Sequence, residues 1–231
     1  MNTMEEFLHK RVLAIYWIVL ALNCVFLYFD LPYIYITEPL LVPLLLLYLF
    51  LNDNNIGKPA GKFIFYIGLF LAFLGDTMQI VINNDVFFLS SLVAFMLMNI
   101  CYSICFFSLH KKGVRKPLPL LITCTIIFLL GYCFIDFLGG EMGDYKMPVI
   151  MYACTLCIMI ALAVNVTRNK LYHQTALKYL LPGSVIFLMQ NLILAMNLFH
   201  FGGHNQLYVF SIVPYGIAQY LMAKGILKVY S

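Results

Sequence analysis

The residues of this sequence that are best suited to chemistry are carboxyl groups inside apolar segments. Asp76 lies about thirteen residues into an apolar run that begins at Phe63, or roughly 20 Å along a helix. Its short side chain cannot reach a membrane surface from that depth, and an ionisable group in hydrocarbon is a functional hypothesis by default. Asp76 is therefore the first candidate catalytic residue. The alternative is a structural carboxylate that ties helices together.

Glu38 is the second carboxyl group of interest. It lies about five residues into another apolar run and precedes Pro39. Because it is close to the end of that run, it is either a solvated residue at a helix start or a second acid. Two carboxyl groups in different environments can divide acid–base work, since burial and nearby negative charge both favour the protonated form of one of them.

Uncharged polar side chains occur at similar depth in several apolar runs. Gln79 follows Asp76 by one helical turn, and the other polar residues are Asn99, Tyr102, Tyr152, Gln190, Asn191, Tyr215 and Gln219. Taken singly, each could simply bond a neighbouring helix, at about 0.6 kcal/mol on average. Together they predict a polar chamber in the middle to outer part of a membrane, with aromatic and aliphatic walls. Such a chamber suits a lipid with a polar head group.

Metal and cofactor chemistry has little support in the sequence. His200 and His204 are four residues apart, but two glycines lie between them and no third ligand is evident. Cys154 and Cys157 form a C-x-x-C outside any soluble βαβ context. Phosphate-loop and common hydrolase motifs are absent. We therefore expect neither a metal nor a cofactor.

The composition explains where these residues must lie. Of the 231 residues, 63% are hydrophobic and 10% are charged, whereas a soluble domain has about 25% charged residues. The mean hydropathy is +0.92. The apolar runs are continuous and about 20 residues long, as membrane-spanning helices require, and they are too long for alternating barrel strands. We expect an all-α, multi-pass bundle in a bacterial inner membrane.

Eight such runs follow one another with short connections, and no second domain or internal repeat is visible. The single membrane domain therefore covers residues 1–231. The predicted runs are Val12–Phe29, Tyr33–Leu51, Phe63–Ile82, Val86–Leu109, Leu118–Leu138, Pro148–Val166, Leu180–Phe201 and Leu207–Val229.

The basic residues set the orientation. Thirteen of the fourteen lie on alternate connections or at the ends, and Lys146 is the exception. Positive residues gather on the cytoplasmic side of membrane proteins. This pattern predicts an even number of crossings with both termini in the cytoplasm. It also accounts for the net charge of +4 without a nucleic-acid partner. The oligomeric state stays open.

Several short motifs, in order along the chain, resemble those of a known family. Gly68-Leu69 and Gly75-Asp76, followed by Phe95 and Tyr102, resemble the pattern G-L-x(5)-G-D…F-x(3)-H-x-x-Y of the YhhN family of membrane proteins, which includes the lysoplasmalogenases. Weaker matches to the same family are Pro39-Leu40, Pro43, Pro148, Tyr152, Met159, Gly183, Phe187, Ala195, and the pair Tyr215 and Gln219. The likeness runs from about Pro39 to Leu227.

The resemblance implies a hydrolase that cleaves the vinyl ether of a lysolipid, and it implies Asp76 as a catalytic residue. Three positions differ from the family pattern. Glu38 stands where lysine is usual, Asn99 where histidine is usual, and Gln190-Asn191 where Ser-Asp is usual. Our hypothesis is that Glu38 replaces the missing second carboxylate. The alternatives are a relative that binds or senses lipid without turnover and, ranked last, a small transporter with Asp76 as its proton site.

Overall fold

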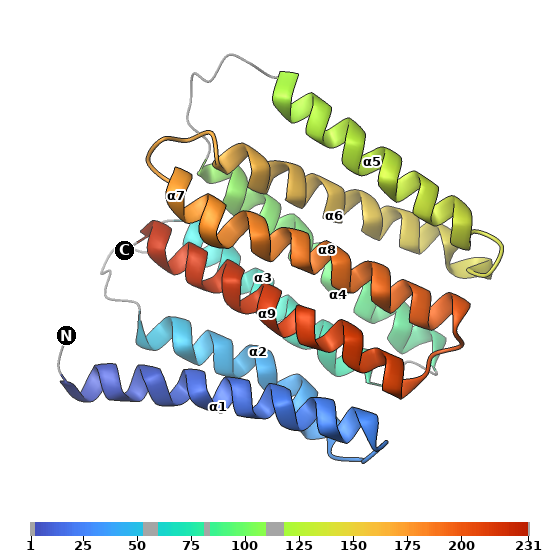
Figure 1. Ribbon diagram of the computed structural model, residues 1–231, viewed down its shortest axis with the longest axis horizontal. Helices are drawn as coiled ribbons and strands as arrows, with labels where there is room; N and C mark the ends of the chain where they lie inside the picture. Colours follow the sequence, from blue (N-terminus) through green and yellow to red (C-terminus); the bar gives the residue numbers. More distant parts are fainter. Residues whose placement is uncertain (1–2, 53–59, 81–83, 110–117, 231) are drawn as a thin grey trace.

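The computed structural model describes residues 3–52, 60–80, 84–109 and 118–230. Across these residues all regular structure is helical, and the long helices run side by side (Figure 1). They are α1 (Thr3–Tyr28), α2 (Ile34–Leu51), α3 (Ala60–Gln79), α4 (Asp85–Ser108), α5 (Leu118–Leu138), α6 (Lys146–Val166), α8 (Leu181–Ala195) and α9 (Asn205–Tyr230). The expected all-α bundle is confirmed.

One helical segment is assembled from four pieces. It begins with the short α7 (His173–Thr175), continues through a π-helical turn (Ala176–Leu180) into α8, and ends in a second π-helical turn (Met196–His200). A short 3₁₀ turn (Gly143–Tyr145) precedes α6. A π-turn holds one residue more than an α-helix needs, and such turns are frequent at functional sites.

Seven helical segments of the described residues are long and apolar enough to cross a membrane. The remaining long helix, α9, is less apolar because it carries Gln219, Lys224 and several tyrosines. Its place inside the bundle explains this composition. The multi-pass membrane fold follows, and each of the eight predicted runs coincides with one helical segment. The first helix starts at Thr3, well before Val12, because a helix can continue into water beyond the apolar stretch that marks its span.

Both termini lie at the same end of the bundle, as an even number of crossings requires (Figure 1). The opposite end carries the α1–α2, α5–α6 and α8–α9 turns, and is called the outer end below. The cytoplasmic placement of the termini stays a prediction from the basic residues, of which Lys58, Lys111, Lys112, Arg115 and Lys116 lie outside the described residues.

The helices pack as a ring with one helix outside it. Around the ring, α3 packs on α2 and α4, α4 on α6, α6 on α8, α8 on α9, and α9 on α1 and α2. Helix α5 packs on α6 and touches the π-turn Met196–His200 at the outer end. It exposes most of its apolar side chains, including Leu129 and Leu130, as a lipid-facing helix does.

Hydrogen bonds between side chains connect the outer turns. Asn205 Nδ2 donates to Asp30 Oδ1 at 2.6 Å, which joins the α8–α9 turn to the α1–α2 turn. Tyr145 Oη donates to Asp85 Oδ1 at 2.6 Å and joins the start of α6 to the start of α4. These contacts fix the outer ends of the helices that enclose the site.

Close packing of α3 on α4 depends on glycine. A Cβ at Gly68 would lie 2.7 Å from Tyr102 Cε1, too close without displacement of the ring. Gly131 in α5 is a matched helical glycine whose added Cβ would meet Cys157 Sγ at an ordinary 3.7 Å.

We expect Gly68→Ala to lower the melting temperature of the purified protein, because overpacking costs about 1–3 kcal/mol and exceeds the gain in helix propensity of about 1 kcal/mol. Gly131→Ala should leave the melting temperature unchanged or raise it. Equal melting temperatures for the two variants would contradict the close approach of α3 and α4.

Candidate functional site

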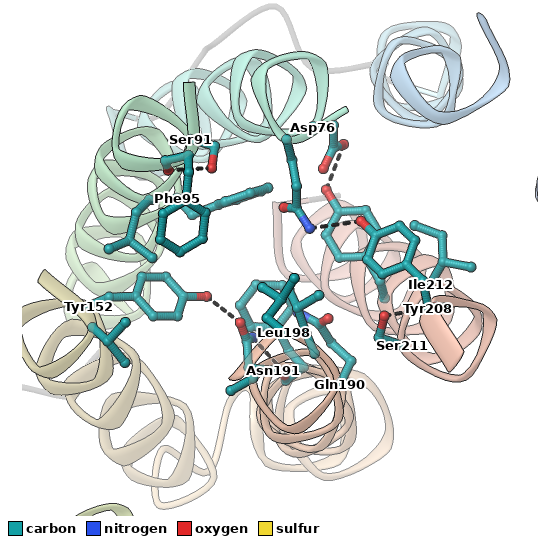
Figure 2. A pocket seen from close by; sticks show the side chains of 18 of the residues that line it. Asp76, Ser91, Phe95, Tyr152, Gln190, Asn191, Leu198, Tyr208, Ser211 and Ile212 are labelled. Carbon is teal, nitrogen blue, oxygen red and sulfur yellow. Dashed lines mark hydrogen bonds between the residues drawn. The ribbon is translucent and has the colours of Figure 1, made fainter. Parts of the chain in front are cut away.

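A cavity lies inside the ring of helices, toward the outer end, and is called the chamber below (Figure 2). Its free volume is about 80 Å³. Five helical segments line it: α3, α4, α6, the segment of α8 with its π-turn, and α9. Its polar lining residues are Asp76, Gln79, Ser91, Tyr152, Gln190, Asn191, Tyr208, Ser211 and Tyr215. The sequence predicts such a chamber, and the structure brings six of the predicted residues into its lining.

Asp76 is held in the chamber by a hydroxyl group from another helix. Tyr215 Oη donates a hydrogen bond to Asp76 Oδ2 at 2.8 Å, and both residues are almost fully buried. Asp76 comes from the last turns of α3 and Tyr215 from the middle of α9, so this bond joins two helices that are distant in sequence. A buried carboxyl group without such a donor is strongly unfavourable.

Gln79 and Tyr208 form a polar chain that ends at Glu38. Gln79 Nε2 donates to Tyr208 Oη at 2.8 Å, and Tyr208 Oη donates to Glu38 Oε1 at 2.8 Å. Glu38 is 3% exposed, so it is not a solvated residue at a helix start. It does not line the chamber and reaches it through Tyr208.

An amide is fixed on the opposite wall of the chamber. Tyr152 Oη donates to Asn191 Oδ1 at 2.6 Å, and Asn191 Nδ2 donates to the carbonyl oxygen of Phe187 at 2.7 Å (Figure 2). With both polar atoms engaged, the Asn191 side chain has one orientation. Gln190, the preceding residue, is buried in the chamber wall.

Besides Glu38, three predicted site residues lie outside the chamber lining. Tyr102 Oη donates to Gln219 Oε1 at 2.8 Å, and Gln219 Nε2 contacts Met98 Sδ at 3.6 Å. Asn99 is fully buried, and neither of its amide atoms has a hydrogen-bond partner among the described residues. The structure therefore places these three residues in the packed interior of the bundle and not in the chamber lining.

Sequence reasoning missed Tyr208, Ser91 and Ser211. Tyr208 precedes Tyr215 by seven residues, which places both on one face of α9. That spacing could have identified it. The two serines bond the carbonyl oxygens of Phe88 and Tyr208, three residues before each on the same helix, and their position in the chamber has no signal in the sequence.

His200 and His204, near the end of the α8 segment, interact at the outer end of the bundle and do not line the chamber. His200 Nδ1 lies 3.0 Å from Glu141 Oε1, and the backbone of His204 is bonded to the Asn197 side chain. Among the residues that the structure describes, no three histidine, cysteine or acidic side chains form a group able to hold a metal ion.

The chamber therefore combines a carboxyl group with a single hydroxyl donor, a second carboxyl group behind a tyrosine, and fixed amides in an apolar setting. Such a set can donate and accept protons at carboxyl groups that are almost fully buried. Its free volume suits a small polar segment of a ligand and not a whole lipid, so a long tail would extend beyond it.

Comparisons with known proteins give one match. The model of a family described as the YhhN family matches residues 33–226, which is most of the chain. No curated protein and no solved structure matches the sequence.

Tyr215→Phe tests the anchoring of Asp76. The variant leaves Asp76 Oδ2 without its donor, so we expect a loss of about 1–3 kcal/mol in the free energy of unfolding. Tyr132→Phe, on the lipid-facing side of α5, is the control and should leave it unchanged. Equal unfolding free energies for both variants would show that the Tyr215 hydroxyl does not anchor Asp76.

Proposed function

This chain belongs to the YhhN family, and on that basis we propose that it is a membrane hydrolase that cleaves the vinyl-ether bond of a lysolipid. The products are a fatty aldehyde and a glycerophospho head group. The observation that carries the proposal is Asp76 itself. It is a buried carboxyl group in a chamber inside the membrane, held by one hydroxyl donor.

Vinyl-ether hydrolysis needs what such a carboxyl group offers. The acid donates a proton to the β-carbon of the double bond, which leaves an oxocarbenium ion at the carbon beside the ether oxygen. Water adds to that carbon and loses a proton to a base, and the resulting hemiacetal separates into aldehyde and alcohol. The difficult step is the protonation of carbon. A positioned general acid contributes about 10²–10⁴-fold to such a step.

The roles of the residues follow from their positions. Tyr215 occupies Asp76 Oδ2, so Oδ1 is the oxygen from which the proton would pass to the substrate. Glu38 accepts a hydrogen bond from Tyr208, which lines the chamber. Its negative charge, behind that tyrosine, would stabilise the oxocarbenium ion. Asn191 and Tyr152 stand on the opposite wall and would orient the polar segment of the lipid.

The differences from the family pattern are compatible with this assignment, because the chain that lacks one carboxylate of the pattern carries another one elsewhere. Glutamate replaces lysine at position 38, and asparagine replaces aspartate at position 191. A carboxylate is thus lost from α8 and gained on α2, on the other side of Tyr208. The competing reading, a relative that binds lipid without turnover, rests on the neutral amides Asn99 and Asn191.

A panel of lysolipids separates these readings. The protein, purified in mild detergent, is incubated with vinyl-ether, alkyl-ether and acyl lysolipids, and aldehyde and free acid are measured by mass spectrometry. We expect aldehyde from the vinyl-ether lipid alone. Asp76→Asn should reduce its rate by about 10²-fold or more, since the proton donor is removed.

Asp144→Asn, at the exposed outer surface, is the matched control and should retain the wild-type rate. If no lipid gives a product and one of them raises the melting temperature, the proposed hydrolase is wrong and the protein binds lipid without turnover.

Glu38→Gln tests the second carboxyl group. The variant keeps a hydrogen-bond acceptor for Tyr208 and removes the charge, so we expect a lower kcat for the vinyl-ether lipid with an unchanged KM. Glu141→Gln, in the exposed α5–α6 turn, is the control. Full activity of Glu38→Gln beside an inactive Asp76→Asn would exclude the paired-carboxylate mechanism.

A further inference from the structure

A second, smaller cavity adjoins the chamber on the side of α2 and is called the inlet below. Its free volume is about 70 Å³, and its lining includes Ile34, Glu38, Asn197, Gly203 and Asn205. Gln79, Leu198 and Tyr208 also line the chamber, so these three side chains form the wall between the two cavities.

The mouth of the inlet lies in the α8–α9 turn at the outer surface. Gly203 there is exposed. The turn is fixed by hydrogen bonds in both directions between the Asn197 side chain and His204, at 3.1 Å each. Asn205 ties it to Asp30. The opening is therefore held in place by side chains of three segments.

The inner end of the inlet is polar. Glu38 Oε1 accepts from Tyr208 Oη, whose oxygen accepts in turn from Gln79 Nε2. Figure 2 shows Tyr208 at the edge of the chamber. A buried water needs about 10–15 Å³ of free volume and two to four polar partners. The volume and lining of the inlet meet both requirements for several water molecules.

Hydrolysis consumes one water per lipid, and a lipid tail entering the chamber would displace water from it. We propose that the inlet delivers water from the outer surface to the chamber, and that Tyr208 is a positioning residue that holds this water at the boundary. The proposal rests on the proposed function for its role in turnover. The water path itself is testable without turnover.

Glu38 provides the test, because it lines the inlet and not the chamber. X-ray radiolysis of water forms hydroxyl radicals in place, which oxidise the side chains next to that water, and peptide mass spectrometry locates the modified residue. In the purified wild-type protein we expect modification at Glu38. Ile34→Trp fills the inlet, so it should abolish modification of Glu38 and lower the turnover of vinyl-ether lipid.

Ile36→Trp is the matched control, since Ile36 lies on the same helix and is 67% exposed toward lipid. It should retain both modification and turnover. Equal modification of Glu38 in the two tryptophan variants would overturn the inlet, whether or not the protein hydrolyses lipid. Modification that behaves as expected in a protein without turnover would keep the inlet and overturn the hydrolase alone.

Tyr208→Phe tests the positioning role. The hydroxyl is lost while the ring stays, so kcat should fall with KM unchanged, and the modification of Glu38 should persist. An unchanged kcat would remove Tyr208 from the mechanism. If KM rises as well, by the same factor by which kcat/KM falls, Tyr208 contributes to lipid binding, and its role in positioning water is overturned.

Discussion

The hydrogen bond from Tyr215 to Asp76 is the interaction on which the arrangement of this site depends. On insertion scales a carboxyl group costs about 2.5–3.5 kcal/mol at the centre of a membrane helix, and Asp76, in the last turns of α3, also needs polar partners inside the bundle. Here the partner comes from α9, the last helix of the chain. The hydrogen bond to Asp76 therefore requires α9 to lie in the ring, where Tyr208 and Tyr215 line the chamber. It also accounts for the lower apolarity of α9, which would make a poor lipid-facing helix.

The same principle organises the surroundings of Asp76. Several polar groups near the chamber are paired across helices: Gln79 with Tyr208, Tyr208 with Glu38, and Tyr152 with Asn191. Pairs of this kind stabilise a membrane bundle modestly, yet they determine which faces meet. Glu38 and Asp76 are the carboxyl groups of the network; Asp76 lines the chamber, whereas Glu38 is bonded to Tyr208 and does not line it. In the proposed mechanism this layout would separate proton donation from charge stabilisation, and the described chamber lining contains no lysine, arginine or histidine.

Much of this could be predicted from the sequence, and the limits have physical reasons. Long apolar runs define spans, so the helices appear where hydropathy places them. The depth of Asp76 follows from counting residues. Helical periodicity gives the face on which each polar residue lies, but it does not say which helix that face contacts. The sequence therefore places Tyr102 and Gln219 in the chamber, whereas the structure bonds them to each other outside its lining. The proximity of Glu38 to the site depends on Tyr208, a contact 170 residues apart that no spacing rule contains.

The π-turn at Met196–His200 has a consequence for how this chain could vary. It carries one residue beyond the α-helical count, and each residue of an α-helix turns the chain by about 100°. Loss of a single residue there would restore a regular helix. It would also rotate Leu198 and Phe199 out of the chamber wall, and Asn197 away from the turn that it holds. Insertions and deletions at this turn are therefore changes to the site itself, whereas in most membrane proteins length varies freely in the turns between helices. A related chain that is one residue shorter here would have a differently shaped chamber even with every polar residue retained.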